Sequence, residues 1–170
     1  MTTPIEELKI RARLLCNSLK KTDSTAQQRA AAAVKLQHWS MPSTWTLGRC
    51  LNIVSVEAGF DQWEHARTVL SGAAAGGENM GRFWYDKGCA HLLNHWFASY
   101  PQAKESLQLR GRRYLLPYER QFIVADAPFI EMLGIDAAAP AWTAIGFDLV
   151  AGYGSPAWRA LVDARLQSHW

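Results

Sequence analysis

The stretch that decides the fold runs from Gly81 to Ala125 and reads GRFWYDKGCAHLLNHWFASYPQAKESLQLRGRRYLLPYERQFIVA. Its first half contains a short apolar and aromatic run from Ala90 to Phe97, and a run of this length and composition favours a strand over a helix. The residues that follow begin a helix, because Ser99 is a suitable N-cap and Pro101 suits the first helical turn. The sequence therefore predicts a strand and then a helix.

A second strand is predicted after this helix. Apolar residues recur at helical spacing until Gly111, and a longer apolar run follows from Tyr114 to Ala125. Pro117 lies inside that run and cannot donate a hydrogen bond to a sheet, so it marks an edge or a bulge. Two parallel strands need a connection of about a dozen residues or more, and such crossovers are nearly always right-handed. We therefore expect a β-α-β unit with parallel strands.

The first part of the chain has the signature of helices. Thr3 and Glu6 form a capping box, and the apolar spacing after them predicts a helix that ends near Lys20. An alanine-rich run from Ala30 to Leu36 predicts a second helix, because alanine has the highest helix propensity. Two further helices are expected on either side of Gly59, which is placed to adopt the left-handed conformation that ends a helix.

The turn between these two helices carries a resemblance. Gly59, Phe60 and Trp63 form a GF-x-x-W pattern within residues 49–63. This segment resembles the short helical module found beside ankyrin arrays and in proteins labelled as glyoxalase-superfamily domains. The resemblance implies a helical hairpin clamped by the two aromatic side chains, and it implies no catalytic residue. Glyoxalase chemistry would need paired metal-binding βαβββ units, and the pattern of residues 90–125 has no second copy.

These elements predict an α+β chain in two parts. The first part, residues 1–72, is a helical module. Residues 73–80 are small, polar and glycine-rich and predict a linker or loop. The second part, residues 81–170, is expected to be a small α/β domain built around at least one β-α-β unit.

Composition and charge narrow the class of protein. The chain has 170 residues, of which 49% are hydrophobic, so it can bury a core. It has no apolar run near the ~18 residues that span a bilayer and no signal-peptide pattern at its start, so we expect a cytoplasmic protein without a membrane partner. The first 70 residues hold nine Lys and Arg against six acids. That excess is too sparse for a nucleic-acid surface, so a nucleic-acid partner is not expected.

Cys89, His91 and His95 are the candidate catalytic residues. On a helix, the two histidines would share a face and suit one zinc ion. On a strand they would lie roughly 13 Å apart, so the predicted strand assigns no metal ligand. The strand does place Cys89 and His91 on one face, where the imidazole could lower the thiol pKa. Cys89 is then expected to be more accessible and more reactive than Cys16 and Cys50, which we interpret as buried thiols.

Aromatic residues near this segment suggest a ligand pocket. If the two predicted strands are neighbours, side chains at their ends would line one cleft, as open α/β sheets commonly bind ligands there. The alternative is that the eight tryptophans mostly anchor the core. The candidate ligand-binding residues are Trp84, Tyr85, Trp96, Tyr114, Tyr118 and Arg120.

Two classes of function follow. The first is a binding or interaction protein for a small ligand or a protein partner, which fits a chain whose catalytic constellations are all incomplete. The second is a small thiol- or histidine-dependent enzyme, with metal assistance as one form, that uses Cys89, His91 and His95. We favour the first class, and no cofactor can be assigned from the sequence.

Overall fold

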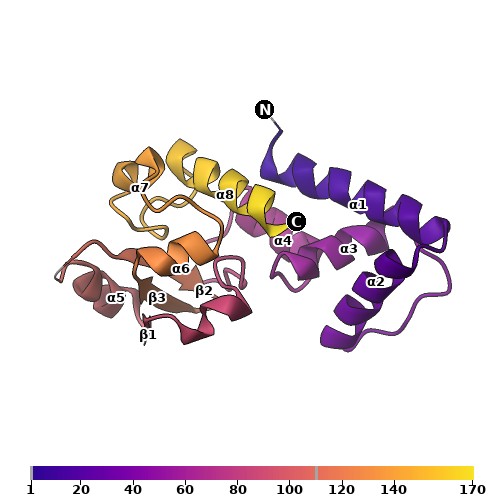
Figure 1. Ribbon diagram of the computed structural model, residues 1–170, viewed down its shortest axis with the longest axis horizontal. Coiled ribbons are helices and arrows are strands. Elements are labelled where there is room, and N and C mark those ends of the chain that lie inside the picture. Colours follow the sequence, from indigo (N-terminus) through magenta and orange to yellow (C-terminus); the bar gives the residue numbers. More distant parts are fainter. Residues whose placement is uncertain (1, 110) are drawn as a thin grey trace.

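The structure is a computed structural model that describes residues 2–109 and 111–170. Within these residues it contains eight α-helices and one three-stranded antiparallel sheet, which confirms the α+β class. Figure 1 shows an elongated molecule with α1 to α4 at one end and the sheet at the other. The last helix, α8, lies between these two ends.

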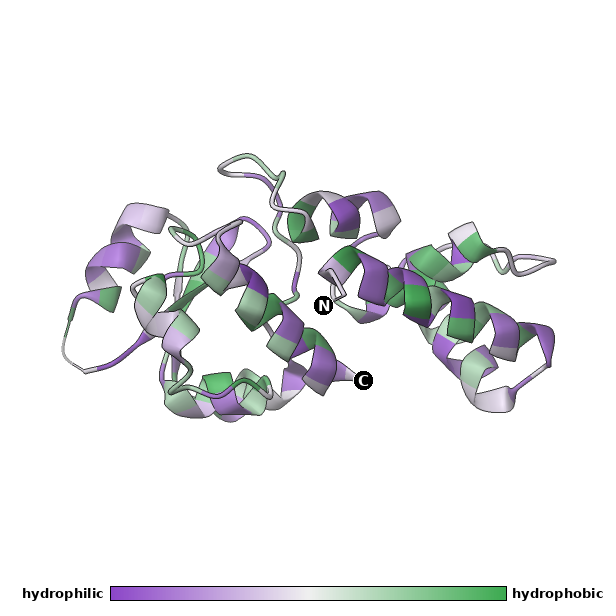
Figure 2. Ribbon diagram, turned by 90° about the horizontal axis from the view of Figure 1, so that it is seen from above, coloured by the Kyte–Doolittle hydropathy of each residue, from purple (hydrophilic) through white to green (hydrophobic). Residues whose placement is uncertain are grey.

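The helices of the first part follow from their caps and apolar faces. Thr3 caps α1 (Pro4–Lys20) through the predicted capping box with Glu6, and Asp23 caps α2 (Ser24–Leu36). The helices α3 (Leu47–Glu57) and α4 (Trp63–Leu70) complete this part. Each of the four buries one face, and Figure 2 shows apolar and polar bands alternating along α1 and along α8. The predicted capping box and its helix are confirmed.

The predicted hairpin around Gly59 is present. Gly59 has a φ of 96°, so it adopts the left-handed conformation after α3. Phe60 is buried and stacks on Phe83 with ring centroids 5.7 Å apart. The backbone of Arg82 donates a hydrogen bond to the carbonyl of Gly59 at 2.7 Å. The turn is therefore held by the chain that enters the second part.

The sheet differs from the prediction. Its strands are β1 (Asn94–Phe97), β2 (Tyr114–Tyr118) and β3 (Gln121–Ala125), in the order β1-β3-β2, and both neighbouring pairs are antiparallel. The predicted helix between the strands is α5 (Tyr100–Leu107). Because β1 and β2 both run opposite to β3, they point the same way but do not touch. The predicted parallel orientation of the two strands is therefore present, but β3 lies between them and splits the β-α-β unit.

Two local features explain this difference. The run from Tyr114 to Ala125 folds back on itself at Glu119 and Arg120, and Glu119 adopts a positive φ of 50° in this turn. The run predicted as the first strand is also shorter than expected, because its beginning belongs to a 3₁₀-helix, η1 (Lys87–His91). One predicted strand is thus a hairpin, and only the second half of the other, Asn94–Phe97, is a strand.

Two cores lie on opposite sides of the sheet. On one side, α5 covers Leu115 and Val124 through Ala103. On the other side, Leu116 and Ile123 belong to the main core, together with α6 (Ala127–Met132), α7 (Pro140–Ala144) and α8 (Pro156–His169). This main core continues without a break into α1, α3 and α4, so the helical module and the sheet share one hydrophobic interior.

Contacts also link the two parts through α8 and through the predicted linker. Arg11 on α1 donates to the carbonyl of Leu166 at 3.2 Å, and His169 contacts the carbonyl of Glu57 at 2.7 Å. The loop over residues 73–80 packs on the second part, where Met80 donates to the carbonyl of Glu119 at 2.9 Å. Among the helices in residues 2–109 and 111–170, none has the length and apolar character needed to cross a bilayer.

Candidate functional site

The structure brings together three of the six predicted ligand-binding residues. The rings of Tyr85, Trp96 and Tyr118 meet edge to face, with centroids 5.9, 5.4 and 4.8 Å apart. Trp96 remains 43% exposed. The guanidinium of Arg82 lies 5.9 Å from the ring centroid of Tyr118 and pairs with Glu119 at 2.6 Å. These rings form a partly exposed aromatic cluster over one face of the sheet.

The other three predicted residues lie elsewhere. Trp84 and Tyr114 are buried, and the hydroxyl of Tyr114 donates to the carbonyl of Ala137 at 2.7 Å. Both side chains are therefore part of the core. Arg120 lies in the turn between β2 and β3, where its guanidinium donates to the carbonyl of Gly77 at 3.2 Å. The predicted pocket thus divides into a surface cluster, two core residues and one cation at a loop.

The candidate catalytic residues face different environments. Cys89 is fully buried and contacts the carbonyl of Phe129, whereas His91 and His95 are exposed. The expectation of an accessible Cys89 is therefore wrong. The reason is η1, which turns the thiol inward and the His91 imidazole outward, while a strand would have placed both on one face. Within residues 2–109 and 111–170, no three His, Cys, Asp or Glu side chains are grouped to hold a metal ion.

All three thiols are expected to react slowly in the folded protein. Burial raises the pKa of Cys89, and burial together with the neighbouring Cys16 raises the pKa of Cys50 to about 12. Little thiolate is therefore present near pH 8 at Cys50 and Cys89, and the Cys16 side chain is buried as well. Labelling by iodoacetamide at pH 8, followed by intact mass, should show one slow phase in buffer and fast labelling of all three thiols in urea. Rapid modification of Cys89 in the folded chain would contradict this burial and restore the thiol-enzyme interpretation.

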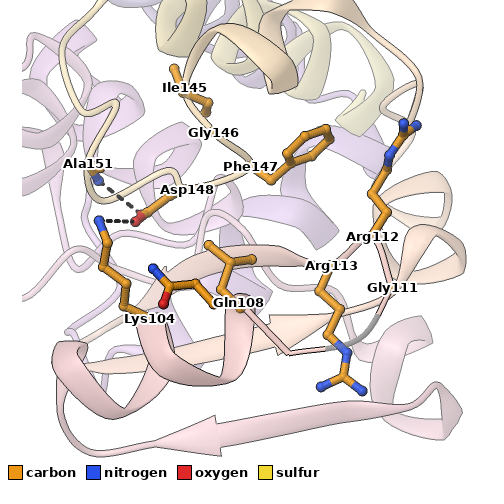
Figure 3. Close-up of a pocket in the computed structure, with 11 residues that line it drawn as sticks. Lys104, Gln108, Gly111, Arg112, Arg113, Ile145, Gly146, Phe147, Asp148 and Ala151 are labelled. Carbon is orange, nitrogen blue, oxygen red and sulfur yellow. Dashed lines mark hydrogen bonds and ion pairs between the residues drawn. The ribbon is translucent and has the colours of Figure 1, made fainter.

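A different site is present between α5 and the segment that follows α7. A cavity of about 430 Å³ opens there. Figure 3 shows Lys104 of α5 and Gln108, the C-cap of that helix, on one side of it and Phe147 with Arg112 on another. We call this the cationic pocket; it is lined by Lys104, Leu107, Gln108, Gly111, Arg112, Arg113, Ile145, Gly146, Phe147, Asp148 and Ala151.

The segment that carries Phe147 and Asp148 is held in place by β2. Leu115 donates to the carbonyl of Phe147 at 2.9 Å and accepts from the amide of Leu149 at 3.0 Å. The two residues flanking Asp148 are thus fixed to the outer edge of the sheet by a parallel bridge. One wall of the cationic pocket is therefore a backbone segment of fixed position, and the opposite wall is α5.

The acid that lines the pocket, Asp148, is fully engaged by the protein. It is 2% exposed. One carboxylate oxygen accepts from the amides of Val150 and Ala151 at 2.9 and 3.0 Å, and the other accepts from the Tyr100 hydroxyl at 2.6 Å. Burial and this hydrogen bond to Asp148 raise the pKa of Tyr100, so its hydroxyl stays a donor. Asp148 therefore organises the wall of the pocket rather than offering a free base.

The cations of the pocket are only partly compensated. The Lys104 ammonium donates to the Tyr100 hydroxyl at 3.2 Å and lies 3.7 Å from Asp148, and it is 47% exposed. The Arg112 guanidinium lies 5.3 Å from the ring centroid of Phe147, and Arg113 reaches Asp126 only at 3.9 Å. Hydrogen bonding to Tyr100 raises the pKa of Lys104, which keeps its amine charged at neutral pH. The pocket thus presents Lys104 and Arg112 beside apolar side chains, while the Arg113 side chain points away from both (Figure 3).

The sequence analysis missed these residues, although one signal was present. Residues 109–113 read LRGRR, which is a dense basic run around a glycine. The other half of the site, Phe147 and Asp148, has no local signature, because contacts between distant segments bring it to α5: the parallel bridge to Leu115 and the hydrogen bond from Tyr100. No known protein family, curated protein or solved structure matches the chain. The resemblance of residues 49–63 to a helical module therefore remains an expectation.

Proposed function

We propose that the protein binds a small anionic ligand in the cationic pocket. The observation that supports this most is the engagement of Asp148. Its carboxylate accepts hydrogen bonds from two amides and a hydroxyl and lies 3.7 Å from the Lys104 ammonium, so its single charge compensates at most one of the cations that line the pocket. A pocket with more cations than acids attracts anions, and either an ammonium or a guanidinium can bind a carboxylate or a phosphate.

The shape of the pocket limits the size of this ligand. Its volume of about 430 Å³ lies in the range of small-molecule sites. The apolar parts of Leu107, Ile145 and Phe147 would contact the uncharged part of the ligand, and the cations around them would orient its anionic group. A binding role needs no catalytic group, and Asp148 and Tyr100 are both committed to holding the wall. A thiol enzyme is less well supported, because Cys89 is fully buried.

Titration of ¹⁵N-labelled protein with inorganic phosphate and with succinate tests this proposal. We expect saturable shifts of amides near residues 104–113 and 145–151, and tighter binding at low salt. The double variant Lys104→Gln/Arg112→Gln should bind the preferred anion at least about tenfold more weakly, because charge-assisted hydrogen bonds contribute about 1.5–3 kcal/mol each.

The matched control loses the same charge away from the pocket. Lys35→Gln/Arg159→Gln removes two exposed cations from α2 and α8 and should leave the affinity unchanged. Equal losses in both double variants would show that the anions bind through net charge alone. Absence of saturation with either anion would remove the proposal.

A further inference from the structure

We infer that a second cavity, beneath the glycine-rich loop over residues 74–80, is a binding site for a small neutral ligand with one apolar ring. We call it the loop cavity. Its volume is about 220 Å³, and its walls come from four separate segments of the chain. The inference does not depend on the cationic pocket. The side chains that carry it are Met80, Tyr100, Pro117, Phe122, Val150 and Tyr153.

The walls of the loop cavity are aromatic and held in place. Tyr100 on α5 packs against Phe122 on β3, with ring centroids 5.7 Å apart. On the other side, the Tyr153 ring meets the buried Trp158 edge to face at 4.8 Å. Phe122 thus lines the cavity beside Tyr100, and the Tyr153 ring is supported by the buried Trp158. Such surfaces can contact both faces of a flat apolar ligand without rearranging.

The polar groups in these walls are already used by the protein. The Tyr153 hydroxyl donates to the carbonyl of Val69 at 2.6 Å and accepts from the amide of Ala74 at 3.1 Å. The Tyr100 hydroxyl donates a hydrogen bond to the Asp148 carboxylate and accepts one from the Lys104 ammonium. Neither hydroxyl has a free hydrogen for a ligand. A polar ligand would lose its hydration without compensation, so the interior selects an apolar group.

The loop that covers the cavity is fastened mainly at its ends. Ala74 is held by Tyr153, and Met80 donates to the carbonyl of Glu119 at 2.9 Å. Between these ends the loop is exposed, and Gly77 accepts one hydrogen bond from Arg120 at 3.2 Å. A ligand can therefore enter by displacing a short exposed segment. The charged side chains around the loop, Glu78, Glu119 and Arg120, line the edge of the same cavity.

The volume sets the size of the ligand. Dry apolar cavities of about 150 Å³ lined by Leu, Ile and Phe bind benzene. The loop cavity is larger at about 220 Å³, so it has room for one ring with a short substituent. The segment 148–151 lies between this cavity and the cationic pocket, since Val150 lines the first and Asp148 and Ala151 line the second. The two sites therefore take ligands of different chemistry on the two sides of one wall.

Toluene is a suitable probe, because it is neutral, has one ring and lacks the anionic group that the cationic pocket is proposed to bind. We expect saturable ¹H–¹⁵N shifts confined to the four lining segments of the whole chain, which are residues 74–80, residue 100, residues 117–122 and residues 150–153. Ala74→Phe places a ring in the cavity and should weaken toluene binding by about tenfold or more. Its control is Ala73→Phe, which adds the same ring at the neighbouring exposed residue outside the cavity and should bind toluene as the unchanged protein does.

If Ala74→Phe does not fold, Ala75→Phe replaces it, because Ala75 lines the same cavity and is exposed. Three results would overturn the inference. These are no saturation up to the solubility of toluene, shifts that map outside the four lining segments, and equal affinity in the filled variant and the Ala73→Phe control. The inference is supported if the unchanged protein binds toluene and the filled variant does not, while the spectrum of the variant remains that of the folded protein. This result is independent of the outcome for phosphate and succinate.

Discussion

Replacing Gly59 with valine is expected to lower the free energy of unfolding by about 3 kcal/mol, because it combines backbone strain with overlap. At a φ of 96° a β-branched residue is strained wherever it is placed. A Cβ atom there would also lie 2.8 Å from the carbonyl carbon of Arg82 and 2.9 Å from the amide nitrogen of Phe83. Both neighbours are backbone atoms, so neither can move aside as a flexible side chain would. Urea unfolding followed by circular dichroism measures the change.

The matched control for this variant is Gly48→Val. Gly48 lies in the first turn of α3 and is exposed, and a Cβ atom added there would meet no other described segment of the chain within 4 Å. Its replacement should change the free energy of unfolding by no more than about 0.5 kcal/mol, since surface substitutions are commonly this small. Equal stability of Gly59→Val and Gly48→Val would show that the turn before Phe60 does not constrain the fold.

Replacing Arg165 with methionine is expected to cost about 3 kcal/mol as well, since a buried acceptor left without its donor costs about 1–3 kcal/mol and a severed charge pair adds to this. Arg165 lies on α8 and is 4% exposed. Its guanidinium donates to the carbonyls of Phe83 and Leu133 at 3.2 and 3.0 Å and lies 4.0 Å from Asp86. Methionine keeps most of the packing of the stem, so the loss reports the polar contacts.

The exposed arginine on the same helix provides the comparison. Arg159→Met should change the free energy of unfolding by no more than about 0.5 kcal/mol, because Arg159 is exposed. Both variants can be measured by the same urea titration. If Arg165→Met is as stable as Arg159→Met, then the two carbonyls find other donors or water, and the buried guanidinium does not join α8 to the rest of the second part.

The helices could be predicted because their determinants are local. Thr3 and Glu6 cap α1 from within one turn, and Gly59 ends α3 through its own backbone conformation. The sheet could not be predicted in the same way. Residues 114–125 read as one apolar run because Leu115 and Leu116, which face opposite sides of the sheet, are both buried. The turn inside that run uses Glu119 at positive φ, where a glycine or asparagine would have given a signal.

The cationic pocket cannot be recognised from the net charge of a long stretch of the sequence. Residues 71–170 hold nine Lys and Arg (18 − 9) and nine acids (15 − 6), so this part of the chain has no net formal charge. The basic run at residues 110–113 is concentrated within it, and the acids that balance it lie mostly elsewhere. The net charge of each part therefore indicated a basic excess in residues 1–70 and none in residues 71–170. Counting over short windows would have found Arg112 and Arg113, while their proximity to Phe147 depends on the fold.

The contacts between α1 and α8 also determine the order in which the chain can finish folding. Arg11 and Leu166 are 155 residues apart in sequence, and Arg11 and Arg29 both lie close to the ring of Trp170. Synthesis proceeds from the N-terminus, so α1 to α4 leave the ribosome long before α8 exists. Their apolar faces toward α8 stay in water until then, and contacts of such long range form slowly. The helical module is thus a surface that chaperones can reach until α8 has been made.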